Sequence, residues 1–102
     1  MRRLASVGAA ALAVAASAAA AATHTVVVDG FRFEPAELTV ARGDTVVWVN
    51  RDAVAHTATA AGVFDSGVVA PAKSASLTLA RIGRHDYVCT LHPTMKARIV
   101  VR

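Results

Sequence analysis

The chain has 102 residues, 55% of them hydrophobic, and a formal net charge of +4. This length suffices for a single domain and excludes two full-sized ones. The basic residues are scattered along the chain and are not interleaved with aromatic residues, so nucleic acid is not an expected partner.

The segment 1–22 has the pattern of a secretory signal peptide. Arg2 and Arg3 precede a stretch that is almost entirely alanine up to Ala22. A charged start, an apolar middle and small residues before the cut define such a leader. We therefore expect export to the periplasm, removal of residues 1–22 and a mature domain at 23–102. The alternative is a retained membrane anchor, but alanine is weakly hydrophobic, so we expect no stable membrane insertion.

From residue 23 onward, short alternating or β-branched runs follow one another. They predict strands at 25–28, 31–33, 37–40, 45–50, 56–60, 74–80, 85–90 and 96–101. Turn signals separate them, among them Asp29-Gly30 and Arg42-Gly43-Asp44, and the segment 62–67 is expected to be a loop. Short strands at this spacing predict an all-β sandwich of about seven or eight strands.

A mature domain of about 80 residues can bury only a small core. Neighbouring residues in a strand point to opposite faces, so only part of the apolar set can face inward. The candidates are Val26, Val28, Phe33, Leu38, Val40, Val47, Trp48, Leu77, Leu79, Tyr87, Val88, Ile99 and Val100.

Three residues with metal-binding side chains are spaced three positions apart near the C-terminus. Cys89 is the sole cysteine of the chain, and His92 and Met95 follow it. His56 lies far upstream of Cys89, in a segment that reads as the end of a strand. A thiolate, two imidazoles and a thioether are the ligands of a mononuclear blue-copper electron-transfer site. We therefore predict one copper ion per chain, cycling between Cu(I) and Cu(II).

A loop closed at both ends by strands can hold such ligands rigidly. We expect Cys89 to end one strand, Met95 to precede the next and His92 to lie at the tip, with His56 arriving from a neighbouring strand end. Each residue alone has a plainer role, and Cys89 alone could be a buried, inert thiol. Together they disfavour zinc, which has no use for Met, and haem, which needs C-x-x-C-H.

The chain resembles a known family at residues 31–35 (FRFEP), 43–50 (GDTVVWVN), His56 and 87–95 (YVCTLHPTM). It is similar to the cupredoxins, the type 1 blue copper proteins, and within them most like amicyanin, plastocyanin and pseudoazurin. The resemblance covers nearly all of the mature chain. It implies a Greek-key sandwich with copper buried near one end, and a soluble one-electron carrier.

Two positions depart from that family's pattern. Thr57 stands where relatives often carry an Asn that ties the two ligand-bearing segments together, and its hydroxyl could take over part of this role. Leu91 stands where amicyanin-like loops often carry Pro. The expected mature domain is also short and lacks an N-terminal extension, so the partner of amicyanin is not carried over to this chain.

The loop tip also predicts where redox partners dock. His92 lies between Leu91 and Pro93, and we expect it to be the exposed ligand. An apolar patch of Leu91, Pro93, Val54 and Ala55 around it would favour the small, transient contacts that redox encounters need. We expect a monomer whose donor and acceptor are redox proteins.

The main competing function is copper handling, by a chaperone or store that binds copper without fast redox cycling. An enzyme is not expected, because the domain is small for a substrate pocket and the sequence offers no nucleophile–base pair. His85 is expected at the surface. If the leader were cut after Ala21, His24 would be the third residue and could bind Cu(II) with the terminal amine.

Overall fold

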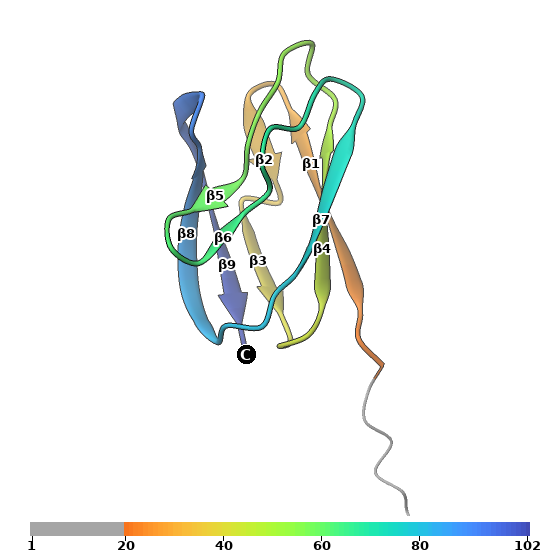
Figure 1. The fold of residues 1–102 in the computed structure, drawn as a ribbon, viewed down its shortest axis with the longest axis vertical. Helices are drawn as coiled ribbons and strands as arrows, with labels where there is room; N and C mark the ends of the chain where they lie inside the picture. Colours follow the sequence, from red (N-terminus) through yellow and green to blue (C-terminus); the bar gives the residue numbers. More distant parts are fainter. Residues whose placement is uncertain (1–19) are drawn as a thin grey trace, which may run out of the picture.

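The computed structural model describes residues 20–102 as a sandwich of two β-sheets, and this part of the chain contains no helix (Figure 1). Most of the expected signal peptide, residues 1–19, lies outside the described residues. No helix able to cross a membrane occurs among residues 20–102. The strands are β1 (Thr23–Asp29), β2 (Arg32–Glu34), β3 (Glu37–Val40), β4 (Thr45–Asn50), β5 (Thr59–Ala60), β6 (Phe64–Asp65), β7 (Ser74–Thr78), β8 (Gly83–Cys89) and β9 (His92–Val101).

One sheet has the strand order β2-β1-β4-β7 and the other has the order β3-β9-β8-β5-β6. Strands β1 and β4 pair in parallel, as do β3 and β9, and the remaining pairs are antiparallel. The parallel pairs arise because the chain leaves the first sheet after β2, contributes β3 to the second and returns as β4. The predicted all-β sandwich is confirmed, with an additional short strand, β6, inside the segment 62–67 that was expected to be a loop.

The core lies between the sheets, and Trp48 and Tyr87 are its largest members. The indole N–H of Trp48 donates a hydrogen bond of 3.3 Å to the Tyr87 hydroxyl, and the Phe33 ring packs 4.8 Å from the Tyr87 ring. Burial raises the pKa of Tyr87 to about 12, although the bond from Trp48 acts in the opposite direction. The core therefore joins the two sheets through β2, β4 and β8.

Most of the expected core residues are buried, but three of the valines expected in the core are not. Val47, Val88 and Val100 are half-exposed, whereas Val46 and Val101 are buried. The reason is the two-residue period of a strand: Trp48 faces inward, so Val46 does as well and Val47 cannot. Leu38 and Leu77 pack against the core from partly buried positions.

His85 is buried, with 9% of its surface exposed, so the expectation of a surface position is wrong. It shares the inward face of β8 with Tyr87 and Cys89, because side chains at alternate positions of a strand face the same way. Its Nε2 lies 2.8 Å from the Arg81 carbonyl oxygen, which can only accept, so the ring donates this hydrogen bond. His85 is thus a core histidine with a satisfied ring nitrogen.

Three connections meet at one end of the sandwich, away from the C-terminus: the β1–β2 turn, the loop after β4 and the β8–β9 turn (Figure 1). Strand β8 ends at Cys89 as expected, but β9 already begins at His92, so the turn is tighter than predicted and Met95 lies within β9. The strand expected at 56–60 is shorter than predicted, because β5 covers only Thr59–Ala60 and His56 precedes it in an isolated bridge with Val69.

At the opposite end of β1, the buried carboxylate of Asp44 ties the start of β1 to the turn before β4. It accepts hydrogen bonds of 2.9 Å from the backbone N–H groups of Ala22 and Ala41, and His24 Nε2 lies 2.9 Å away. The bond from His24, followed by those from the two N–H groups, lowers the pKa of Asp44 from 3.8 to about 2.

This shift predicts an acid dependence of stability. Below pH 3.8 the unfolded chain protonates Asp44 before the folded protein does, so the stabilisation is full above pH 3.8 and is lost as the pH falls toward about 2. We expect wild type to exceed Asp44→Asn in free energy of unfolding near neutrality, and the difference to shrink between those two pH values. Urea denaturation of the metal-free proteins measures it, and a difference that does not change with pH would show that the folded protein does not favour the ionised form of Asp44.

Candidate metal centre

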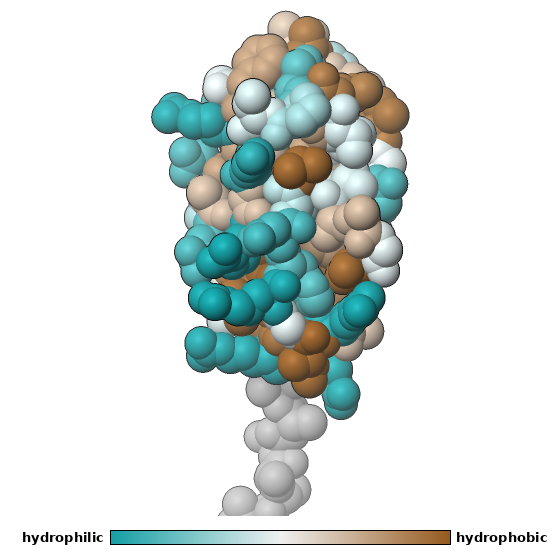
Figure 2. All heavy atoms as spheres, turned by 90° about the vertical axis from the view of Figure 1, so that its left-hand side faces the viewer, coloured by the Kyte–Doolittle hydropathy of each residue, from teal (hydrophilic) through white to brown (hydrophobic). Residues whose placement is uncertain are grey.

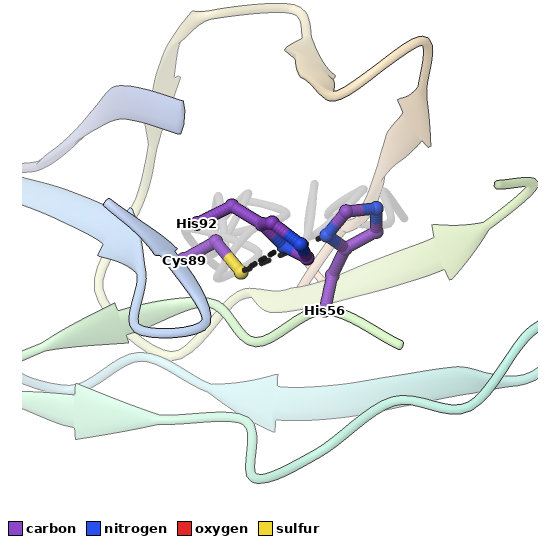
Figure 3. Close-up of side chains that lie close together, drawn as sticks. All are labelled: His56, Cys89 and His92. Carbon is purple, nitrogen blue, oxygen red and sulfur yellow. Dashed lines mark hydrogen bonds between the residues drawn. The ribbon is translucent and has the colours of Figure 1, made fainter. Parts of the chain in front are cut away.

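Cys89, His56 and His92 come together at the end of the sandwich where the three connections meet (Figure 3). The Cys89 Sγ atom lies 3.6 Å from His56 Nδ1 and 3.7 Å from His92 Nδ1. The three ligand atoms lie within 4.8 Å of one another. Cys89 and His56 are fully buried and His92 is half-buried. The structure thus brings these three side chains of the predicted site together.

The distances fit a shared metal ion better than hydrogen bonds from the thiol. Bonds of about 2.3 Å to a thiolate and about 2.0 Å to an imidazole, meeting at about 120°, place sulfur and nitrogen about 3.7 Å apart. Both measured separations are close to this value. A thiol carries one proton and can donate it to one ring only. The donor set and its spacing therefore fit a single ion held by a thiolate and two imidazoles.

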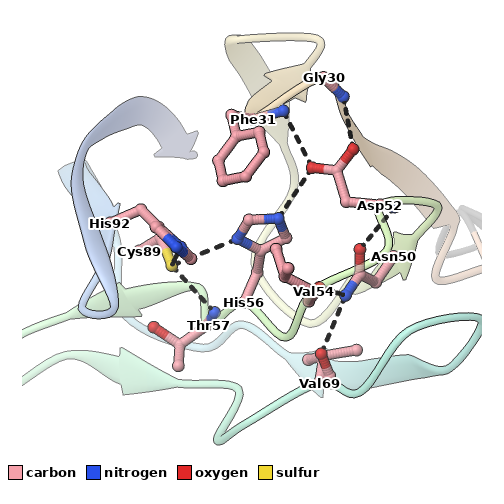
Figure 4. A network of polar contacts seen from close by, with 10 residues as sticks. All are labelled: Gly30, Phe31, Asn50, Asp52, Val54, His56, Thr57, Val69, Cys89 and His92. Atoms are coloured by element: carbon pink, nitrogen blue, oxygen red, sulfur yellow. Dashed lines mark hydrogen bonds and ion pairs between the residues drawn. The ribbon is translucent and has the colours of Figure 1, made fainter.

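The orientation of His56 is fixed by Asp52. The N–H at His56 Nε2 donates a hydrogen bond of 2.8 Å to the Asp52 carboxylate (Figure 4). The other ring nitrogen, Nδ1, then keeps a free lone pair that faces Cys89. A carboxylate on the far nitrogen is the usual support of a metal-binding histidine, because it fixes the tautomer and the ring orientation. Asp52 is thus a functional residue that sequence reasoning missed.

Asp52 is itself held by the β1–β2 turn. It accepts the backbone N–H of Gly30 at 2.7 Å and that of Phe31 at 2.9 Å. Burial raises the pKa of Asp52, but the bonds from Phe31, His56 and Gly30 together outweigh burial and hold the pKa below 3.8. The carboxylate is therefore ionised at neutral pH, as an acceptor for His56 must be.

The loop that carries Asp52 and His56 is organised by Asn50, a fully buried residue at the end of β4. Its amide nitrogen donates to the carbonyl oxygens of Val54 and Val69, at 2.8 and 3.0 Å, and its Oδ1 accepts the Asp52 N–H at 2.9 Å. The His56 backbone also exchanges both of its hydrogen bonds with Val69. The His56 side chain is thus rigidly placed although no long strand carries it.

Phe31 covers the two histidines from the β1–β2 turn. Its ring meets His56 edge-on at 5.2 Å and His92 edge-on at 5.0 Å, measured between ring centroids. Its backbone has a φ of 59°, which is uncommon for a residue other than glycine. The two N–H bonds to Asp52 hold the turn in this shape. No local pattern predicts these contacts, since Phe31 is distant from both histidines along the chain.

Thr57 joins the two ligand-bearing segments, a role that the sequence left open for its hydroxyl. Its backbone N–H donates to Cys89 Sγ at 3.3 Å, and its Oγ1 accepts the Thr90 N–H at 2.9 Å. The side chain thus takes a hydrogen bond from the residue that follows Cys89, while the backbone supports the sulfur itself.

Met95 is buried and belongs to the same core cluster as Cys89. Its role as a fourth ligand stays a prediction. The residues of the expected docking patch are exposed, except for Ala55, which is half-buried. Among the larger apolar side chains at this end, Leu91 is 51% exposed and Phe31 is 49% exposed. Figure 2 shows hydrophobic residues at the upper end of the molecule, together with others lower on the same face.

Two known proteins, both named amicyanin, are similar to this chain in sequence. Amicyanin from Paracoccus denitrificans is 38% identical over 88 residues, which cover 74% of this chain and 64% of that protein. Amicyanin from Paracoccus versutus is 29% identical over 86 residues, which cover 74% of this chain and 62% of that protein. The chain thus spans slightly less than two thirds of the length of both relatives.

Solved structures agree with these relatives. A Cu(I) form of an amicyanin mutant superposes with a TM-score of 0.72 at 34% identity, covering 78% of this chain and 82% of that one. An oxidised form of another amicyanin mutant superposes with a TM-score of 0.72 at 35% identity, with the same coverage of both chains. A family model described as a cupredoxin-like domain matches residues 2–101. The chain belongs to the cupredoxin-like family.

Proposed function

We propose that this protein is a periplasmic type 1 copper protein that carries single electrons between redox partners. The observation that carries the proposal is the triangle of Cys89 Sγ, His56 Nδ1 and His92 Nδ1, with separations of 3.6 and 3.7 Å from the sulfur. Bound copper would supply a one-electron couple at this triangle. The amicyanin relatives support the same assignment.

The protein's own residues would keep the site the same in both oxidation states. Cys89 is anchored at the end of β8, His92 at the start of β9, and His56 by its bond to Asp52. We propose that the buried thioether of Met95 would be the fourth ligand, since blue-copper sites add a weakly bound thioether to a thiolate and two imidazoles. A framework that does not rearrange lowers the barrier to electron transfer.

His92 is the proposed exit for the electron, because it is half-buried while His56 is fully buried. Leu91 and Pro93 flank it, Val54 is exposed, and Phe31 extends the expected patch. We propose that redox proteins dock here through small, transient apolar contacts, and that the carrier itself is monomeric.

We also propose that the leader, residues 1–22, directs export and is removed. The alanine-rich pattern supports this. The single, buried Cys89 fits an exported copper protein as well, because an exported chain with one cysteine cannot use it for an internal disulfide, whereas a metal can use its thiolate.

Loading the purified domain with copper tests the proposed function. We expect an intense blue thiolate-to-copper band and a type 1 EPR signal, both lost in Cys89→Ser, together with reversible electrochemistry. A folded wild type with weak colour, from which a chelator removes copper rapidly, would instead support a copper chaperone or store and would contradict the carrier.

Asp52 gives a second prediction. Asp52→Ala removes the acceptor for His56 Nε2, so we expect the copper dissociation constant to rise by about 10- to 100-fold. Competition with a calibrated chelator measures it. The control is Asp86→Ala, which removes a carboxylate that is 75% exposed and pairs with Arg98. Equal affinities for Asp52→Ala and wild type would show that Asp52 does not position His56.

The docking face gives a third prediction. Leu91→Asp places a charge on the proposed patch, so we expect electron self-exchange between Cu(I) and Cu(II) copies to slow by roughly tenfold or more at low salt, with the blue band unchanged. Ile82→Asp is the matched control, since Ile82 is 60% exposed and precedes β8 at the other end of the sandwich. Similar NMR-derived rates for both variants would argue against the patch.

A further inference from the structure

A chain of hydroxyl groups leads from the metal centre to a carboxylate on the neighbouring hairpin. Thr90 Oγ1 lies 3.0 Å from Thr57 Oγ1, which lies 3.0 Å from Thr59 Oγ1. The Thr59 hydroxyl donates to Asp65 Oδ1 at 3.1 Å, and the same oxygen accepts the Gly67 N–H at 2.8 Å. Side chains from β5, β6, the segment before β5 and the β8–β9 turn thus form one connected path.

The carboxylate fixes the direction of every bond in this path. An ionised carboxylate can only accept, so Thr59 must give its single hydroxyl proton to Asp65. Thr57 must then donate to Thr59, and Thr90 must donate to Thr57. The Thr57 oxygen also accepts the Thr90 backbone N–H. All hydroxyl protons therefore point from the ligand turn toward Asp65, and bonds aligned in this way strengthen one another.

The backbone on either side of Thr57 is bonded to the segment 66–69, since His56 exchanges both of its backbone hydrogen bonds with Val69 and Ala58 bonds Ser66 through its N–H and its carbonyl oxygen. Its attachment on the β8 side is weaker. Strand β5 is very short, and it pairs with β8 at a single position, Thr59 with Val88. Yet the N–H of Thr57, just before this strand, must stay on Cys89 Sγ. The side-chain bond from Thr57 to Thr90 adds an attachment to the ligand turn on this side, and the bond to Thr59 orients the Thr57 hydroxyl.

We propose that Thr59 and Asp65 are positioning residues for the metal centre. By orienting the Thr57 hydroxyl they hold the Thr57 segment against Thr90, and so keep the Thr57 N–H on the Cys89 sulfur. An N–H bond to the thiolate draws electron density from it and favours the reduced metal, since hydrogen bonding around this sulfur tunes the potential of blue-copper sites. The electrochemical part of this inference rests on the proposed copper function.

The test compares Thr59→Val, which keeps the shape but breaks the path, with Thr59→Ser, which keeps the hydroxyl. In the metal-free protein we expect hydrogen exchange at the Thr57 and Thr90 amides to accelerate by about 2- to 10-fold in Thr59→Val, the range of one net hydrogen bond. In the copper-loaded protein the reduction potential should fall. Thr59→Ser should restore both values, and Asp65→Asn should move both in the direction of Thr59→Val.

The matched control is Thr78→Val, which removes one hydroxyl from the exposed Thr45–Thr78 pair on the other sheet. It should leave the Thr57 and Thr90 amides and the potential unchanged. The proposal is overturned if Thr59→Val matches wild type in exchange, if exchange accelerates without a fall in potential, or if Thr78→Val has the same effects. A wild type without a copper–thiolate band would refute the copper function alone, because the exchange experiment uses metal-free protein.

Discussion

The whole structure depends on keeping a sulfur and two imidazole nitrogens, from two segments far apart in the chain, within 4.8 Å of one another. Two of the three groups come from a single tight turn, because β8 ends at Cys89 and β9 begins at His92. The third comes from a loop, where the backbone bridge to Val69 and the bond to Asp52 replace a strand. The sandwich therefore acts as a frame that meets the separation of about 3.7 Å that a shared ion requires.

This end of the molecule buries the sulfur of the site and exposes apolar side chains beside it. Cys89 has no exposed surface, and removing a thiolate from water is costly unless other groups compensate. The Thr57 N–H gives part of this compensation, and a bound cation would give the rest. Phe31 and Leu91, by contrast, leave about half of their surfaces exposed beside half-buried His92. The same end thus shields the sulfur and presents an apolar face to a partner.

Local patterns predicted the features that depend on local geometry. The C-x-x-H spacing predicted that Cys89 and His92 lie together, because a turn of few residues joins them. The two-residue strand period could not be phased from sequence alone, so His85 and Val47 were assigned to the wrong face. The link between Asp52 and the Phe31 turn was not readable either, because it joins the β1–β2 turn to the β4–β5 loop across the tertiary structure. The only local feature of the sequence that points to this link is an aspartate shortly before His56.

X-ray absorption at the copper edge reports which atoms surround the ion, and it is therefore the sharpest test of the triangle formed by Cys89, His56 and His92. For wild type loaded with one equivalent of copper, we expect one short sulfur ligand and two imidazole nitrogens, at distances near the roughly 2.3 and 2.0 Å typical of such donors. A ligand shell made of nitrogen and oxygen without sulfur, or a spectrum that is the same after Cys89→Ser, would contradict a copper ion bound at this triangle.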